Sequence, residues 1–121
     1  MEYLIQIRFL RYKGEDMDII VIYCTVPDKK LAKDITKVLM KHKLAACVSR
    51  IENVHSTFAW DGEVNEEKEI LLMIKTRRAN YGKIKLVIED MHSYNVPEII
   101  ALPIVDCSED YLKWLVKETE S

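Results

Sequence analysis

The chain has 121 residues, 49% of them hydrophobic, with 18 basic and 20 acidic side chains and a net charge of -2. This length suits one domain with a buried core and is too short for two. No long run of like charge is present, so a phosphate-binding stripe is excluded and we expect no nucleic-acid partner.

The chain has three cysteines, Cys24, Cys47 and Cys107, an odd number without a CxxC spacing. This argues against a disulfide framework and a structural zinc site, and it favours a reducing, cytoplasmic location. The apolar runs at 19–24 and 70–74 are far shorter than the roughly 20 residues needed to cross a bilayer. We therefore expect no membrane insertion and no metal required for folding.

Residues 1–16 contain several charged side chains and lack the continuous apolar centre of a secretory signal. We predict that they form an N-terminal appendage to a single domain at 17–121. The first strong element, at 18–25, is an apolar and β-branched run that predicts a strand. Asp28 then suits the N-cap of a helix over 28–43, whose apolar residues recur on one face.

The next segments, 44–58 and 69–76, are predicted to form a long hairpin with a turn at Asp61 and Gly62. Helical spacing of apolar residues follows at 79–91. The segment 98–105 is the fourth predicted strand, and because Pro103 lies inside it the strand belongs at a sheet edge. Asp106 or Ser108 can cap a last helix that reaches residue 119.

This order predicts an α+β fold: a ferredoxin-like split βαβ sandwich (βαββαβ plus a C-terminal helix) with an antiparallel sheet. Helices cover only one face of such a sheet, yet three of its strands are apolar at successive positions. Because no further segment is left to cover the second face, we expect another copy of the chain there. The long second strand, at the other edge, is a natural site for pairing between subunits.

Six motifs occur in order: YCTVPD at 23–28, LAACV at 44–48, WDGEV at 60–64, EILLMIKT at 69–76, HSYNVPEI at 92–99 and YLKWL at 111–115. Together they resemble the CutA divalent-cation tolerance proteins over residues 18–119. The resemblance implies a homotrimer, similar in build to the nitrogen-regulatory signalling proteins, with its helices outside and its sheets facing inward. It also implies tolerance of copper and other divalent metals without a catalysed reaction.

The absence of a GxSxG motif and of a Gly-rich phosphate loop also argues against an enzyme. The leading hypothesis is therefore a trimeric protein that binds copper or another metal ion and responds to it. The alternative is a trimeric signalling or scaffold module, related to nitrogen-regulatory proteins, that binds a small ligand or partner protein in its intersubunit clefts.

Neutral imidazole with thiolate or thioether suits copper. The predicted topology places Cys24, Met91 and His92 near one end of a subunit and Cys47 on the order of 15 Å away, so Cys47 could join only from a neighbouring subunit. The resemblance implies Cys24 and His92 as the copper ligands. The opposing interpretation, a core cysteine and a helix-terminal histidine, stays open.

One position departs from the family pattern, which usually has His-Pro-Tyr where this chain has His92, Ser93 and Tyr94. Without the proline, we expect the backbone of His92 to be freer to continue the helix.

A second set of residues resembles the polar and aromatic side chains that the family keeps around its intersubunit clefts: Trp60, Glu67, Glu69, Lys75, Tyr94 and Glu98. Glu69 and Lys75 open and close the predicted third strand, so we expect them to pair only across subunits. The set fits either a small-ligand or anion cleft, or the ion pairs and hydrogen bonds that fix a trimer.

Overall fold

The computed structural model describes residues 18–120, so the predicted appendage lies outside the described residues. The elements in chain order are β1 (Ile19–Val26), α2 (Lys29–Lys41), β2 (Cys47–Trp60), β3 (Glu63–Arg77), the 3-10 turn η2 (Arg78–Asn80), α3 (Tyr81–Met91), β4 (Ile100–Pro103) and α4 (Glu109–Glu118). The strands form one antiparallel sheet in the order β2-β3-β1-β4. The predicted ferredoxin-like fold with a C-terminal helix is confirmed.

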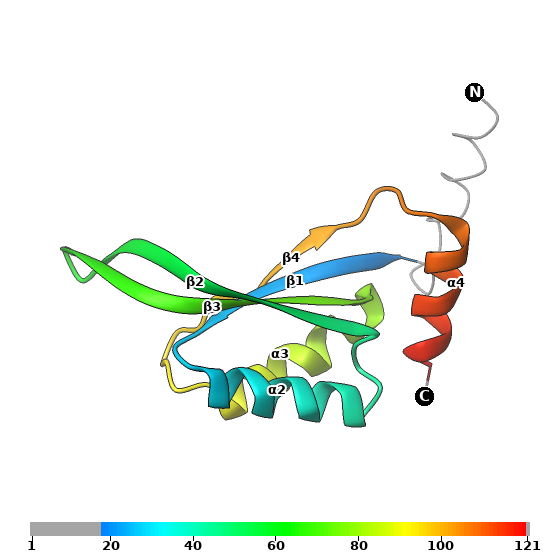
Figure 1. The fold of residues 1–121 in the computed structure, drawn as a ribbon, viewed down its shortest axis with the longest axis horizontal. Helices are drawn as coiled ribbons and strands as arrows, with labels where there is room; N and C mark the ends of the chain where they lie inside the picture. Colours follow the sequence, from blue (N-terminus) through cyan, green and yellow to red (C-terminus); the bar gives the residue numbers. More distant parts are fainter. Residues whose placement is uncertain (1–17, 121) are drawn as a thin grey trace.

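The core lies between one face of the sheet and the two helices α2 and α3, which run side by side beneath it (Figure 1). Alternate residues of the central strands point into this layer. Asp28 caps α2 as predicted, because its carboxylate accepts a hydrogen bond from the Leu31 N–H at 2.8 Å. The side chains with no exposed surface in this layer include Ile22, Cys24, Leu72 and Ile74 from the sheet and Ile35, Leu39, Ile84 and Ile88 from the helices.

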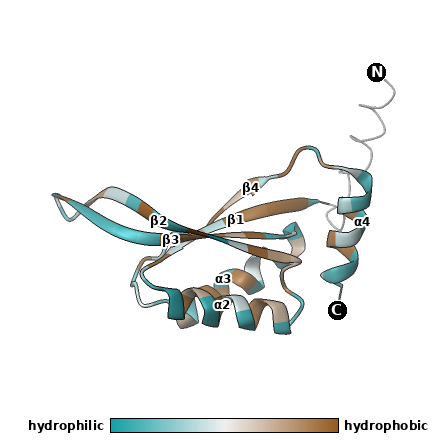
Figure 2. Ribbon diagram, in the orientation of Figure 1, coloured by the Kyte–Doolittle hydropathy of each residue, from teal (hydrophilic) through white to brown (hydrophobic). Residues whose placement is uncertain are grey.

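Strand β2 spans 47–60 rather than 44–58, and β3 and β4 also differ from their predicted bounds. Strand β3 begins at Glu63 rather than at residue 69, because residues 63–68 pair with 55–60 in an arm that extends beyond the helices (Figure 1). Most of this arm is polar, as Figure 2 shows, so no apolar pattern marks it in the sequence. Strand β4 spans only 100–103 rather than 98–105. It pairs with β1 at the sheet edge, where Pro103 was expected.

A bulge in β2 determines which face of the sheet the side chains beyond it point to. The register passes from Ile51 opposite Leu71 to Val54 opposite Glu69, so two residues of β2 face one residue of β3. Asn53 in this bulge has a left-handed φ of 61°. The hairpin turn beyond it has positive φ at both Asp61 and Gly62, as the predicted Asp-Gly turn requires.

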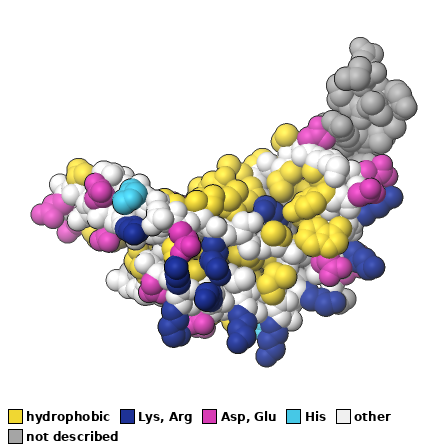
Figure 3. Space-filling view, viewed as in Figure 1, with side chains coloured by type: hydrophobic (Ala, Val, Ile, Leu, Met, Phe, Trp, Pro, Cys, Tyr) yellow, Lys and Arg dark blue, Asp and Glu magenta, His cyan; other side chains and the backbone are white. Residues whose placement is uncertain are grey.

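The sheet face opposite α2 and α3 is apolar and largely uncovered in the single chain. Helix α4 packs at one end of the sheet, where Leu112 and Leu115 contact Ile19 and Ala46. The rest of the face presents half-buried or exposed hydrophobic side chains, and Figure 3 shows hydrophobic side chains gathered over β1 and β4. These residues are Val21, Tyr23, Ile51, Leu71, Met73, Ile100 and Leu102, and we call them the open face.

A buried polar cluster joins the start of α3 to the loop before β2. The side chains of Thr76 and Asn80 both donate hydrogen bonds to the Leu44 carbonyl oxygen. Asn80 is 6% exposed and also donates to the Thr76 hydroxyl at 3.3 Å.

Replacing Asn80 with alanine should lower the free energy of unfolding by about 1–3 kcal/mol, since two hydrogen bonds are lost and a buried carbonyl loses one donor. The measurement is the urea midpoint relative to wild type. Asn95→Ala, at an exposed asparagine, is the matched control and should leave the midpoint nearly unchanged. Equal midpoints for the two variants would contradict a stabilising role for this cluster.

Candidate functional site

The helix α3 ends at Met91, and His92 has extended backbone angles of φ -72° and ψ 142°. The expectation that the helix is freer to continue without a proline is therefore wrong. A hydrogen bond supplies the restriction instead: the Tyr94 N–H donates to His92 Nδ1 at 3.0 Å. This bond, together with the contact between the two rings at 4.7 Å, fixes the direction of the imidazole.

The second imidazole nitrogen of His92 points at strand β1. Its Nε2 lies 2.8 Å from the carbonyl oxygen of Thr25. A carbonyl only accepts hydrogen bonds, whereas Nδ1 itself accepts one from Tyr94, so this network assigns the neutral tautomer with its proton on Nε2. Both ring nitrogens of His92 are thus engaged by the backbone.

Cys24 lies beside this contact, with its side chain on the core face of β1. Its side chain has no exposed surface, and burial raises the pKa of the thiol to about 12, with smaller contributions from the charges of Glu98 and Glu69. The thiol is therefore protonated at neutral pH, and it faces the Thr25 carbonyl oxygen at 3.8 Å. Cys24 and His92 both contact this one backbone oxygen, in agreement with the prediction that they lie near one end of the subunit.

The other predicted cysteine ligand, Cys47, lies elsewhere. Cys47 pairs with Lys75, which pairs with Val21, so Cys47 is two strands across and three residues along from Cys24, about 15 Å away. Its thiol lies 3.8 Å from the Lys75 ammonium. Met91, by contrast, packs against the core cluster that contains Cys24, near which it was predicted. Within residues 18–120, no group of three or more histidine, cysteine, aspartate or glutamate side chains could hold a metal ion.

Most of the predicted cleft residues lie between the β2-β3 hairpin and the loop that follows α3. The Tyr94 hydroxyl donates a hydrogen bond to a Glu69 carboxylate oxygen at 2.8 Å. Trp60, Glu67 and Tyr94 line a cavity of about 340 Å³ together with Phe58. These side chains come from β2, β3 and the loop, and the strand pairing places Phe58, Trp60 and Glu67 on one face of the hairpin.

The carboxylates around Tyr94 make this region acidic. Burial raises the pKa of the Glu98 carboxyl, and the charge of Glu69 raises it further. The pKa of the Tyr94 hydroxyl is raised first by burial, then by its hydrogen bond to Glu69 and by the charges of Glu69, Glu67 and Asp28. The hydroxyl is therefore a neutral donor to Glu69 at physiological pH.

Lys75 is the member of the set that the structure separates from the others. Strand β3 begins before Glu69, so this glutamate does not open the strand as predicted. Lys75 is nevertheless six residues further along, about 20 Å from Glu69. Its ammonium donates to the Ser49 hydroxyl at 3.0 Å. A pair between Glu69 and Lys75 of different subunits stays a prediction.

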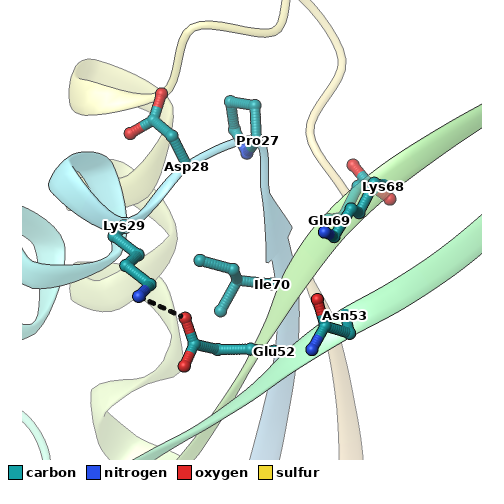
Figure 4. Close-up of a pocket in the computed structure, with 8 residues that line it drawn as sticks. All are labelled: Pro27, Asp28, Lys29, Glu52, Asn53, Lys68, Glu69 and Ile70. Atoms are coloured by element: carbon teal, nitrogen blue, oxygen red, sulfur yellow. Dashed lines mark ion pairs between the residues drawn. The ribbon is translucent and has the colours of Figure 1, made fainter.

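A second cavity, of about 470 Å³, lies between the start of α2 and the β2 bulge. Figure 4 shows Lys29 reaching from α2 to Glu52 in the bulge, with Ile70 between the helix and the hairpin. The Lys29 and Glu52 side chains pair at 3.2 Å. Because acidic and basic side chains alternate around this cavity, its charges largely compensate one another.

Sequence reasoning missed Thr25, which contacts His92, and Phe58, which lines the cavity with Trp60 and Tyr94. Thr25 contributes a backbone oxygen, which has no sequence signal. Phe58 could have been found, because it ends the predicted strand and stands two residues before Trp60, so a strand continued to Trp60 places both side chains on one face.

Comparisons with known proteins agree on one family. A family model described as CutA1 divalent ion tolerance protein matches residues 20–118. The divalent-cation tolerance protein CutA of Thermus thermophilus is 41% identical over 82% of this chain and 96% of that protein. The chloroplastic protein CutA of Arabidopsis thaliana is 39% identical over 84% of this chain and 56% of the plant protein.

Solved structures show the same fold. The crystal structure of CutA1 from Oryza sativa has a TM-score of 0.83 at 37% identity and covers 88% of this chain and 98% of the rice chain. A structure described as the periplasmic divalent cation tolerance protein CutA from Archaeoglobus fulgidus has a TM-score of 0.82 at 33% identity, covering 84% of this chain and 99% of that one. No helix within residues 18–120 is long and apolar enough to span a membrane.

Proposed function

This chain belongs to the CutA1 family of divalent ion tolerance proteins, and from that premise we propose that it acts in divalent-cation tolerance as a homotrimer that binds copper. Thiolate and imidazole together suit Cu(I), and other divalent cations are further candidates. The matched family and the Thermus relative are named for cation tolerance, so a signalling or scaffold role has no observation in its favour.

One observation supports a metal site: the Cys24 thiol and the His92 imidazole meet at the Thr25 carbonyl oxygen. The two groups would hold the ion only after the thiol loses its proton and the His92 nitrogen is freed from this oxygen. Freeing Nε2 by moving the proton to Nδ1 also breaks the bond from the Tyr94 N–H. Metal binding is thus linked to the conformation of the loop after α3.

The homotrimer is supported by the uncovered open face and by the two sheet edges, β2 and β4, that have no partner strand within residues 18–120. Three copies that join a β2 edge to a neighbour's β4 edge would close into a ring. We also propose a cytoplasmic location, although the Archaeoglobus structure is described as periplasmic and the Arabidopsis relative as chloroplastic. The three cysteines form no disulfide, which supports this location.

The test is an anaerobic titration in which the reduced protein competes with a Cu(I) chelator. We expect wild type to withdraw one copper ion per chain and the double variant Cys24→Ala, His92→Ala to withdraw none. The matched control is Cys47→Ala, which should behave as wild type because Cys47 lies at the other end of the strands. Equal titrations of wild type and the double variant would overturn this site.

A further inference from the structure

The cavity between the hairpin arm and the loop after α3 combines aromatic walls with negative charge. Phe58, Trp60 and Tyr94 line it from two segments of the chain, with Pro27 and Val96 as further apolar walls. Trp60 is 56% exposed and Phe58 40% exposed in the single chain. Large aromatic side chains that share a cavity while remaining this exposed are able to contact a ligand.

The charge at this cavity has one sign. Glu67 lines it, and Glu69 accepts the hydrogen bond of Tyr94 immediately beside it. Among the described residues that line the cavity, none is a lysine or an arginine. The ring face of tryptophan, tyrosine or phenylalanine attracts cations, and nearby carboxylates add a longer-range attraction.

We propose that the cavity lined by Phe58, Trp60, Tyr94 and Glu67 binds a small organic cation of the alkylammonium class. The aromatic rings contact the apolar groups around the nitrogen, and Glu67 provides the opposite charge. The volume of about 340 Å³ is ample for such a molecule. A compact metal ion has no apolar surface for these walls, so the ligand proposed here differs from the copper proposed at Cys24 and His92.

The probe is tetramethylammonium chloride, titrated at constant ionic strength against sodium chloride. The background is Trp114→Phe, which leaves Trp60 as the one tryptophan in the chain. Tetramethylammonium should change the Trp60 fluorescence in a saturable way. Neopentyl alcohol, a neutral molecule of nearly the same shape, should bind at least tenfold more weakly.

Two variants and one control separate the contribution of the carboxylate from that of the aromatic ring. Glu67→Gln should weaken tetramethylammonium binding at least tenfold, whereas Glu66→Gln, on the opposite face of β3, should leave it unchanged. Trp60→Ala should abolish binding measured by calorimetry while circular dichroism shows an intact fold. Equal binding of the alcohol, equal effects of the two glutamine variants, or no saturable binding would overturn the proposal. The same conclusion follows if wild type binds nothing and Trp60→Ala changes the molecular mass in solution, because a neighbouring copy then fills the cavity.

Discussion

Replacing Met73 with aspartate should convert the proposed homotrimer into folded monomers. Met73 lies near the middle of the open face, opposite Tyr23 on β1 and Ser49 on β2. In a trimer whose sheets face inward, an aspartate here must be desolvated without a partner, at a cost of several kcal/mol per chain. In a monomer the same carboxylate is solvated. The measurement is the molar mass by light scattering after gel filtration.

The control for this substitution is Met40→Asp, which introduces the same change at a methionine that is 45% exposed on α2. This helix lies on the covered side of the sheet, so Met40→Asp should remain assembled. Circular dichroism should show the same fold for both variants. A Met73→Asp protein with the mass of wild type would show that the open face is not the interface.

Alkaline pH should destabilise wild type more than it destabilises Cys24→Ala. The thiol of Cys24 is neutral in the folded protein because burial raises its pKa from 9.0 to about 12. Below pH 9 the thiol is protonated in both the folded and unfolded states and contributes no pH dependence. Above pH 9 it ionises only in the unfolded state, so stability is lost progressively until about pH 12.

Each pH unit in this window is worth about 1.4 kcal/mol, so the loss by pH 12 should be about 4 kcal/mol. Urea midpoints at pH 8, 9, 10 and 11, at one protein concentration, give the difference between the two proteins. The tyrosines with raised pKa values are present in both, so their titration cancels. Parallel curves for wild type and Cys24→Ala would show that the thiol is not buried in the neutral form.

The fold could be predicted because apolar spacing and caps mark nearly every element. Asp28 is an N-cap in the sequence and in the structure, and Pro103 lies on an edge strand as its missing N–H requires. The outer half of β3 could not be predicted in the same way. Residues 63–68 are held by pairing with β2 and not by burial, so they have no apolar pattern.

The candidate site was predictable only at the level of topology. The order of the strands was enough to place Cys24 beside His92 and far from Cys47. It gave no information on the Thr25 carbonyl, the tautomer of His92 or the burial of the thiol, because these depend on backbone atoms and packing. The contacts of Lys75 with Ser49 and Cys47 could not be predicted either, because they depend on the register of β2.

The most direct test of the proposed function is native mass spectrometry of the reduced protein after anaerobic loading with Cu(I) and removal of excess metal. We predict one species with the mass of three chains and three copper ions. The Cys24→Ala, His92→Ala protein should retain the trimer mass and lose the copper. A wild-type trimer that holds no copper would contradict the metal site, and a monomer mass would contradict the assembly.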